Sequence, residues 1–314
     1  MNKSLISVIV PCYNEESGLS VFYTELSNVI NNIENYSFEI IFIDDGSKDS
    51  TIEKILETSE IDPKVKYITF SRNFGKESAM LSGLRNSNGT FVVIMDADLQ
   101  HPPKLLYEMI SGIEEGYDSV ATRRKNRKGE PVIRSYFSKL FYRIVNKTSK
   151  VNITEAATDY RLMNRKMVDA VLEISEYNRF TKGIFEWVGF KTKWIEIDNV
   201  ERVAGETTWS FGGLFSYAIE GIVSFSVAPL KISTLLGSII SLISFLYALY
   251  IVIRTLVFGI DVPGYASLIC IVLFLGGLQL ISIGIIGEYL SRTYLEVKNR
   301  PNYIIDKTNI KNIK

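Results

Sequence analysis

Short apolar runs alternate with mixed polar and apolar stretches over the first third of the chain. The runs are rich in β-branched and aromatic residues and are bounded by turn residues. They are LISVIV (5–10), FEIIFI (38–43), VKYITF (65–70) and FVVIM (91–95). The stretches between them are long enough for helices. This alternation predicts a parallel sheet covered by helices on both faces, and uniformly apolar strands are typical of its buried centre.

Two longer apolar segments near the C-terminus follow a different pattern. Residues 232–253 and 262–287 contain no charged side chain, and charged residues flank both segments. Each segment exceeds the roughly 20 residues that a helix needs to cross a bilayer core. Buried helices of soluble proteins seldom stay uncharged for so long. The pattern therefore predicts a membrane hairpin.

The connection between these segments is short, so the soluble domain and the C-terminal tail should share one side of the membrane. That side carries Lys231, Arg292, Lys298 and Arg300, against Arg254 alone in the far loop. Positive residues favour the cytoplasmic side. We therefore predict a multi-pass protein of the cell membrane. Its parts are a cytoplasmic domain (1–210), a juxtamembrane helix (211–230), two transmembrane helices (within 231–290) and a cytoplasmic tail (291–314).

Composition narrows the possible partners. Lys plus Arg number 35 and Asp plus Glu number 35, so no net charge favours nucleic acid and any attraction for anions must be local. Cys12 and Cys270 lie far apart in segments of different character, which argues against a disulfide framework or a zinc site and fits a reducing compartment. The N-terminal apolar run reaches Pro11 and acidic residues too soon for a signal peptide.

Candidate chemistry begins where the fourth apolar run ends. Asp96 and Asp98 follow that run directly, and residues i and i+2 of an extended chain point the same way. Ligands of parallel sheets bind beyond the carboxyl ends of the strands. Both carboxylates could approach one cation, or one could hold a metal ion while the other binds a hydroxyl group. Mg²⁺ and Mn²⁺ suit such oxygen ligands, but two solvated aspartates in a turn would have the same pattern.

The turn after the second run adds a further pair of acids. Asp44 and Asp45 precede Gly46, as ribose-binding acids do in nucleotide-binding folds. A contact with a base or a ribose is therefore a better interpretation of this pair than helix capping. Ser47 and Asp49, by contrast, fit the start of the next helix.

Two other turns complete the same edge. In VPCYNEE, Pro11, Tyr13 and Glu15 could enclose a nucleotide base, although the same turn could simply start a helix. SRNFGK follows the third run and departs from the Walker A pattern, and no G-x-G-x-x-G occurs. These departures argue against ATP hydrolysis and dinucleotide redox chemistry. Four strand ends with acids or turn residues predict a nucleotide site with a metal ion.

The motifs VPCYNEE, DDGSKDST, SRNFGK, MDADLQHPP and TDYRLM together resemble those of the family 2 (GT-A) glycosyltransferases. The segments ERVAGETTW, FSVAPLKI and IGIIGEYLSRTYLEVKNRP are similar to those of polyprenyl-phosphate glycosyltransferases. The similarity is to the bactoprenol-linked glucosyl and N-acetylglucosaminyl type, with dolichol-phosphate mannose synthase as a more distant relative. It covers nearly the whole chain. It implies an α/β fold: a GT-A nucleotide-sugar-binding domain with a Rossmann-like, mostly parallel sheet, followed by interfacial helices and the hairpin.

The resemblance also implies roles for individual positions. The donor-binding positions are Pro11, Tyr13, Glu15, Asp44, Asp45, Lys76, Asp96, Asp98, Gln100 and Arg202. The positions for Mg²⁺ or Mn²⁺ are Asp96, Asp98 and Gln100. Arg202 matches a basic residue that closes over the donor phosphates. Two positions depart from the family pattern, since Thr208 stands where Lys is usual and His101 where an acid is common. We expect His101 to be a turn residue beside two prolines.

The acceptor is predicted from the membrane pattern. The stretch 134–147 places apolar and aromatic residues at helical spacing between basic ones, which suits a helix on the bilayer surface. An ordinary helix packed on the sheet has the same pattern. In the resembling family, the positions of Arg123, Arg134 and Ser138 hold the lipid phosphate, for which an arginine fork is well shaped. The arginines could also belong to a positive surface for anionic headgroups.

A mechanism follows for the resembling reaction. A phosphate monoester has a second pKa of about 6, so it can attack a sugar's anomeric carbon near neutral pH without a strong base. The protein would align the reactants and stabilise the departing diphosphate through the metal ion and Arg202. The predicted catalytic residues are Asp98, Asp159 and Arg202. Asp159 could accept a hydroxyl hydrogen bond, orient the acceptor or act as a base, and an ion pair with Arg161 is an equal alternative.

We therefore predict the inverting transfer of a hexose or N-acetylhexosamine from a nucleotide sugar, UDP-linked by resemblance, to undecaprenyl phosphate for cell-envelope glycosylation. The predicted partners are the nucleotide sugar, the polyprenyl phosphate and the membrane, without nucleic acid, and a homo-oligomer is left open. A processive synthase should have Q-x-x-R-W and more spanning helices. A soluble-acceptor enzyme would not need the hairpin. A non-enzymatic membrane scaffold would tolerate broken metal motifs, whereas D-A-D with Gln100 is intact.

Overall fold

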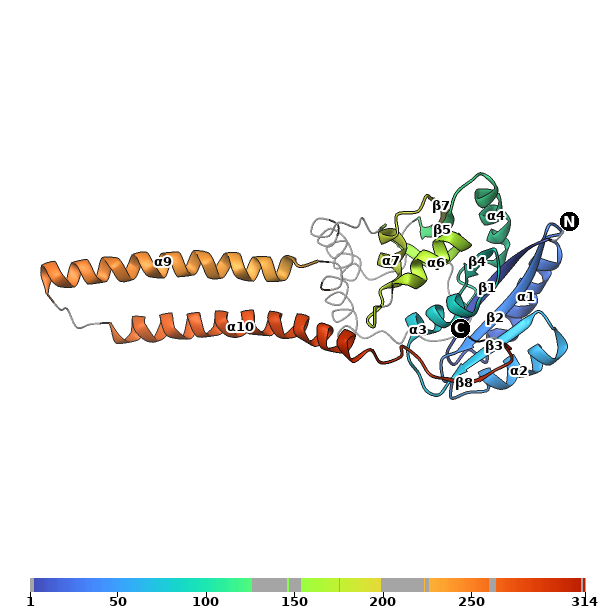
Figure 1. The fold of residues 1–314 in the computed structure, drawn as a ribbon, viewed down its shortest axis with the longest axis horizontal. Helices are drawn as coiled ribbons and strands as arrows, with labels where there is room; N and C mark the ends of the chain where they lie inside the picture. The colour runs from blue at the N-terminus through green and yellow to red at the C-terminus, as the bar shows by residue number, and fades with distance from the viewer. Residues whose placement is uncertain are drawn as a thin grey trace.

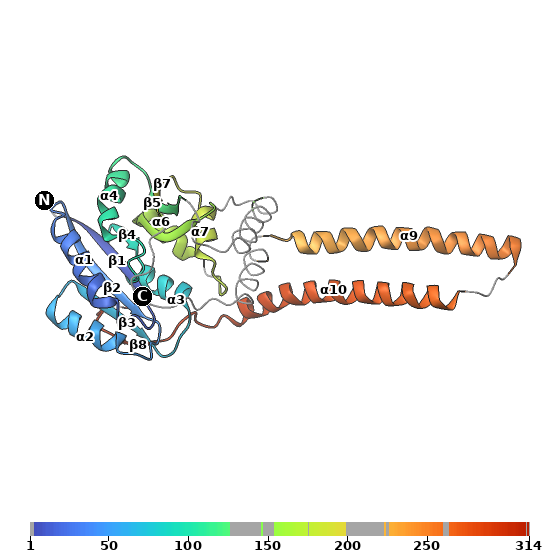
Figure 2. The same ribbon diagram turned by 180° about the vertical axis from the view of Figure 1, so that it is seen from behind.

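The computed structural model describes residues 3–125, 146, 154–174, 176–198, 223, 226–259, 264–311 and 313. An α/β domain lies at one end of the molecule, and two long helices extend from it (Figure 1 and Figure 2). The predicted interfacial helix lies outside the described residues except for Asn146. The predicted juxtamembrane stretch is described only at Val223 and from residue 226 onward.

One eight-stranded sheet forms the centre of the described domain, with the strand order β7-β5-β6-β4-β1-β2-β3-β8. β1 runs parallel to β2 and β4, β2 to β3, and β5 to β7. β6 and β8 run antiparallel to their neighbours. The predicted α/β fold with a mostly parallel sheet is therefore confirmed. The strands are β1 (Ser4–Cys12), β2 (Tyr36–Asp44), β3 (Val65–Phe70), β4 (Phe91–Ile94), β5 (Ser119–Arg124), β6 (Ala157–Asn164), β7 (Thr192–Ile197) and β8 (Ile305–Thr308).

Helices cover both faces of this sheet. Successive side chains of a strand point to opposite faces, so Val8 and Val10 of β1 join the core under α1, α2 and α4, while Ile9 joins the core under α3, α6 and α7. All three side chains are fully buried, as expected for a central parallel strand. The domain helices are α1 (Leu19–Asn31), α2 (Thr51–Ile61), α3 (Lys76–Asn86), the short η1 (Pro103–Leu105), α4 (Leu106–Glu114), α6 (Arg165–Glu173) and α7 (Thr181–Trp187).

The antiparallel strand β6 determines what lies beside the end of β4. Ile94, the last residue of β4, pairs with Arg161 of β6. Asp96 lies two residues after Ile94 and Asp159 two residues before Arg161, and both acids contact Nζ of Lys76, at 2.6 and 2.7 Å. The four-run pattern predicted β4 but not the antiparallel insertion of β6. This proximity of two acids therefore comes from tertiary structure.

Two long helices follow the domain, α9 (Ala228–Phe258) and α10 (Tyr265–Lys298). They lie side by side in both views (Figure 1 and Figure 2). Most of their described apolar side chains are exposed. The segments Ala228–Phe258 and Ile271–Lys298 are long and apolar enough to cross a membrane. Apolar side chains without a protein partner need an apolar surrounding, so these helices agree with the predicted hairpin. The domain boundaries and the side of the membrane stay predictions.

The chain after α10 returns to the sheet, which the sequence did not predict. β8 pairs antiparallel with β3 at the sheet edge. The ring of Tyr303 stacks on Phe70 with centroids 5.0 Å apart, and the Ser71 amide donates to the carbonyl of Ile304 at 3.0 Å. The segment after residue 300 lacks a distinct strand pattern, because a short edge strand is specified by its partner more than by its own residues. The predicted tail therefore belongs in part to the folded domain.

We expect truncation after Arg300 to destabilise the domain. The deletion exposes the edge of β3 and the apolar surface of Phe70, and it removes Ile310 from the core. The melting temperature should fall by about 5 °C or more, as measured by circular dichroism of the purified protein. Truncation after Ile310 is the matched control, because it keeps β8, and it should melt like the intact chain. Equal melting of the two truncated proteins would contradict a structural role for β8.

Candidate functional site

The first two strand-to-helix turns are held together by side-chain hydrogen bonds. The Asn14 amide donates to Ser47 Oγ, and Asn14 Oδ1 accepts from the Lys48 amide, both at 2.9 Å. The Glu15 amide donates to Thr51 Oγ1 at 2.8 Å. Asn14 itself adopts a left-handed backbone with φ of 55°, which asparagine tolerates better than most residues. The turn that carries Tyr13 and Glu15 is thus shaped by the turn that follows β2.

Asp45 connects these turns to the third one. Its carboxylate accepts hydrogen bonds from the amides of Phe74 and Gly75 at 2.6 and 2.8 Å. Burial raises the pKa of Asp45 to about 6. Gly46 has φ of +66°, and a Cβ there would lie 2.5 Å from the carbonyl carbon of Arg72, so only glycine permits this close approach. Asp45 therefore orders the loop before α3, whatever part it takes in donor binding.

Asp44 is tied to its own turn. Both of its carboxylate oxygens accept from the Ser47 amide at 3.3 Å, and burial raises its pKa. Asp49 accepts hydrogen bonds from the Thr51 amide at 3.1 Å and from the Glu16 amide at 3.2 Å. Its place at the start of α2 agrees with the predicted helix-start role. A ribose or base contact for Asp44 stays a prediction.

A pocket of about 270 Å³ opens at the carboxyl ends of the parallel strands. Most of the predicted donor-binding residues line it, namely Pro11, Tyr13, Glu15, Asp45, Lys76, Asp96 and Asp98. Asp44 and Gln100 do not line it, and Arg202 lies outside the described residues, as do Thr208, Arg134 and Ser138. The turns of β1, β2, β3 and β4 therefore converge on one site, as ligand-binding edges of parallel sheets do.

A row of alternating charges runs from this pocket. Lys76 Nζ lies 2.6 Å from Asp96 Oδ1 and 2.7 Å from Asp159 Oδ2, and Lys182 Nζ lies 3.8 Å from Asp159 Oδ1. Burial alone would raise the pKa of Asp159, but the charges of Lys182 and Lys76 outweigh it and hold that pKa well below the ordinary value. Burial would lower the pKa of Lys76, but Asp159 and Asp96 raise it. Asp159 and Lys76 are therefore both charged near neutral pH.

The alternative pairing of Asp159 with Arg161 is wrong. Arg161 is almost fully buried, and its Nη2 lies 3.2 Å from Glu186 Oε1, while Phe185 and Trp194 pack against the guanidinium. Residues i and i+2 of a strand point to the same face, so strand geometry alone does not show whether Asp159 or another group pairs with Arg161. The lysines, which come from other elements, decide the pairing. Asp159 faces the candidate site instead.

The metal motif forms a tight turn after β4. Asp96, Asp98 and Gln100 are partly exposed, while the residues between them are buried. Leu99 takes a left-handed φ of 57°, and the Gln100 amide donates to Asp98 Oδ1 at 3.1 Å. Within the described ranges, no group of three or more His, Cys, Asp and Glu side chains could hold a metal ion. Two carboxylates and an amide fit a divalent cation whose other oxygen ligands come from substrate phosphates.

Two neighbouring arginines of β5 lie near this motif, and the sequence analysis considered only the first of them, Arg123. Arg123, predicted to hold an acceptor phosphate, has its Nη2 2.7 Å from Glu196 Oε1 of β7. Its neighbour Arg124 instead reaches the metal motif, with Nη2 donating to Gln100 Oε1 at 3.5 Å. Adjacent residues of a strand point to opposite faces, but the sequence alone does not say which face holds the site. The acceptor role of Arg123 stays a prediction.

His101 lies in a bend, in agreement with the predicted turn position, and it is buried. It lies beside Pro102, with its ring centroid 5.9 Å from that of Tyr160 and its Nδ1 without a hydrogen-bond partner. Burial lowers its pKa, so the ring is neutral near pH 7. This placement agrees with a packing role beside the metal motif.

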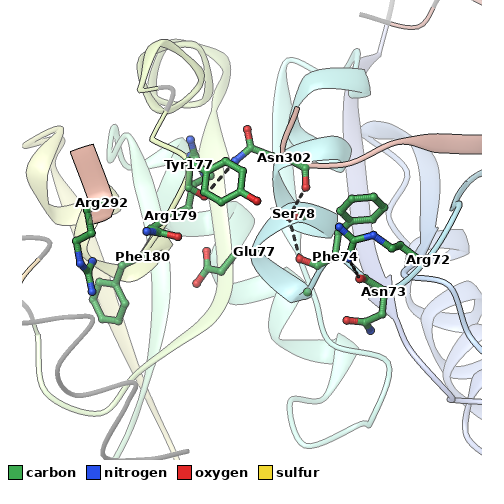
Figure 3. A pocket seen from close by; sticks show the side chains of 12 residues that line it. Arg72, Asn73, Phe74, Glu77, Ser78, Tyr177, Arg179, Phe180, Arg292 and Asn302 are labelled. Carbon is green, nitrogen blue, oxygen red and sulfur yellow. Dashed lines mark hydrogen bonds between the residues drawn. The ribbon is translucent and has the colours of Figure 1, made fainter. Parts of the chain in front are cut away.

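A second cavity, of about 380 Å³, lies between the loop before α3, the segment before α7 and the end of α10 (Figure 3). Glu77 lines it and accepts hydrogen bonds from the amide and hydroxyl of Thr181. Arg292 of α10 and Asn302 line its other walls, and Asn302 accepts from Ser78 Oγ at 3.0 Å through its carbonyl. Lys76 and Glu77 thus face different cavities from the first turn of α3.

We expect Glu77 to make stability pH-dependent. Burial, and then the charge of Asp159, raises the pKa of Glu77 to about 7 from its ordinary value of 4.5. The folded protein then holds a proton that the unfolded chain releases, so the free energy of unfolding falls as pH rises from about 4.5 to about 7. Asp45 acts in the same direction. Glu77→Gln should reduce the loss of melting temperature between about pH 5 and pH 8 by several degrees.

The control for this prediction is Glu173→Gln, an exposed carboxylate on α6. It should keep the wild-type dependence of melting temperature on pH. A Glu77→Gln protein with the same dependence as wild type would contradict the raised pKa.

The sequence matches models of known protein families. The family model of glycosyl transferase family 2 matches residues 7–172, more than half of the chain, and includes all four strand ends of the pocket. The chain belongs to glycosyltransferase family 2. It is therefore a glycosyltransferase, and the predicted GT-A fold agrees with this family. A second model, the GtrB C-terminal hairpin, matches residues 228–293, which contain α9 and most of α10.

Individual family members match the chain over nearly its whole length. CsbB of Bacillus subtilis, whose name gives it as a glycosyltransferase and names no substrate, is 47% identical over 99% of this chain and 94% of its own. The prophage-derived bactoprenol glucosyl transferase of Shigella flexneri is 43% identical over 96% and 98% of the two chains. A glucosyl-3-phosphoglycerate synthase structure from Mycobacterium tuberculosis has a TM-score of 0.49, with 16% identity over 70% of this chain and 79% of its own. That score is too low to support any statement on ligands.

Proposed function

We propose that this glycosyltransferase moves a hexose or N-acetylhexosamine from a nucleotide sugar, UDP-linked, to the phosphate of a membrane polyprenol, undecaprenyl phosphate. The observation that carries the proposal is the row of Asp96, Lys76 and Asp159, which begins in the donor pocket, in a chain with two long apolar helices. Relatives named as bactoprenol glucosyl transferases over nearly the full length support the lipid acceptor.

A divalent cation, Mg²⁺ or Mn²⁺, fits the turn after β4. Asp96, Asp98 and Gln100 would hold it, and Lys76 contacts one of these ligands at 2.6 Å. When bound, the cation supplies charge to offset the departing diphosphate. The donor's base and ribose would lie against Tyr13, Glu15 and their neighbours in the same pocket.

The protein must also align two anionic substrates, the acceptor phosphate and the nucleotide sugar. The acceptor phosphate is mostly a dianion near neutral pH, so its oxygen attacks the anomeric carbon without a strong base, and one displacement inverts that centre. Asp159 is held ionised between two lysines, which favours a positioning role over a proton-accepting one. Arg202 is the predicted cation for the donor phosphates.

The membrane arrangement is part of this proposal. The domain 1–210, the tail 291–314 and both termini would lie in the cytoplasm, joined to the cell membrane by helices at about 232–253 and 262–287. Positive residues near the domain end of the hairpin support this orientation. The lipid phosphate would then reach the site from the cytoplasmic leaflet.

The test is a donor panel. Purified protein with undecaprenyl phosphate is incubated with radiolabelled UDP-glucose, UDP-N-acetylglucosamine and GDP-mannose, with Mg²⁺, with Mn²⁺ and with a chelator. We expect label from one UDP-sugar in the butanol-extractable lipid, and none with the chelator. Label that stays in water with every donor would refute the proposal.

A further inference from the structure

Lys182 lies at the end of the charge row that is furthest from the donor pocket. It belongs to the first turn of α7, and its Nζ lies 3.8 Å from Asp159 Oδ1. Its side chain is 27% exposed, whereas that of Asp159 is 14% exposed. The Lys182 side chain is therefore partly accessible, while that of Asp159 is mostly covered.

The backbone holds Lys182 in this place. Thr181 is buried and donates through both its amide and its hydroxyl to Glu77 of α3. Phe180 is buried beside it. The start of α7 is thus anchored to the first turn of α3, which also carries Lys76. The two lysines approach Asp159 from two elements that are tied to each other.

The row has a direction within the molecule. Asp96 and Lys76 line the donor pocket, but Asp159 and Lys182 do not. Along the long axis of the molecule, α7 lies nearer to α9 and α10 than β1, α1 and α4 do (Figure 1 and Figure 2). The row therefore extends beyond the donor pocket to α7, which lies on the side of the domain from which the apolar helices extend (Figure 1).

Charge favours an anion at this end. Asp159 carries one negative charge between two ammonium groups, so Lys182 shares its counter-ion with Lys76. Lys182 Nζ is 3.8 Å from Asp159 Oδ1, which is beyond hydrogen-bond distance, and an ammonium carries three N–H donors, so Lys182 can donate to a second anion. A lysine is a compact point charge suited to phosphate.

We propose that Lys182 binds the phosphate monoester of the lipid acceptor and that Asp159 holds its ammonium in position. The inference rests on the proposed function and names the residue that receives the second substrate. In the step itself, an acceptor phosphate oxygen forms the bond to the anomeric carbon as the bond from that carbon to the diphosphate oxygen breaks. The diphosphate leaves with the electron pair, and no proton moves. Lys182 offsets the repulsion between two anionic substrates.

The test compares Lys182→Met, Lys182→Arg and the matched control Lys166→Met, which removes an exposed lysine of α6. The full-length proteins are assayed for the KM of undecaprenyl phosphate, the KM of the nucleotide sugar, and the Kd of UDP by calorimetry. Lys182→Met should raise the lipid KM about 10-fold or more. The sugar KM and the UDP Kd should stay within about twofold, and Lys182→Arg should recover part of the lipid KM.

The outcomes separate the two proposals. If wild-type protein labels no lipid, the proposed function fails. If it labels lipid but Lys182→Met leaves the lipid KM unchanged, or raises both KM values and the UDP Kd alike, the role of Lys182 fails alone. Melting temperatures within a few degrees of wild type show that a raised lipid KM is not a folding defect.

Discussion

Asp98→Asn is expected to lower the turnover of sugar transfer by about 100-fold or more. The substitution keeps the size of the side chain and an oxygen that can accept the Gln100 amide, so the turn after β4 should stay intact. It removes one of two carboxylate charges offered to a divalent cation. The loss should be measured as kcat with both substrates saturating, and raised Mn²⁺ should recover part of it.

Replacing Asp98 tests the metal role more specifically than replacing Asp96 does. Asp96 also contacts Lys76 at 2.6 Å, so its replacement disturbs the charge row as well as the metal motif. Asp169→Asn is the matched control, because this carboxylate of α6 is 61% exposed and its contact with Arg165 is long, at 3.8 Å. It should leave kcat unchanged. An Asp98→Asn enzyme with kcat within about threefold of wild type would refute the metal role.

Asp159→Asn is the second change with a large expected effect, a loss of about 100-fold in kcat/KM for the lipid acceptor. The amide cannot balance two ammonium groups, so Lys182 would be repelled from Lys76, which keeps its ion pair with Asp96. The UDP Kd should change much less, because Asp159 does not line the donor pocket. Asp306→Asn, an exposed residue of β8, is the control.

The pH dependence of kcat/KM distinguishes a positioning role of Asp159 from a role as a general base. The pKa of Asp159 lies well below its ordinary value, so its charge stabilises the folded protein at pH values above that ordinary value and loses this effect only as pH falls through the folded pKa. Wild-type kcat/KM should therefore show no inflection from Asp159 above about pH 5, only the acceptor's own ionisation near about pH 6. A further carboxylate inflection that disappears in Asp159→Asn would contradict this account.

The central strands and the two long helices could be predicted because the residues within each segment determine its structure. Mostly apolar runs form β1 to β4, since strands buried on both faces are rich in apolar residues, and the buried Ser7 hydroxyl donates to Glu39 of the neighbouring strand. The acids of the donor pocket could also be predicted, because they follow the strands at the edge where ligands of parallel sheets bind. The uncharged segments form α9 and α10, because their composition alone meets the length of a bilayer.

The parts that escaped prediction depend on contacts between distant segments. β6 and β8 enter the sheet antiparallel, and their partners, not their own residues, set that register. Lys182 reaches Asp159 only because Thr181 is bound to Glu77 of another helix. Arg124 and Arg123 are adjacent in sequence, and only the folded sheet shows which of them meets Gln100.

The central claim is that a sugar becomes bonded to a lipid phosphate, and the product itself tests it most directly. Undecaprenyl phosphate recovered after reaction with the active nucleotide sugar is analysed by mass spectrometry and ³¹P NMR. The account predicts a mass increase of one glycosyl unit and conversion of the phosphate monoester signal to that of a single phosphodiester. An unchanged monoester with free sugar in the water phase, or a diphosphate-linked lipid, would contradict it.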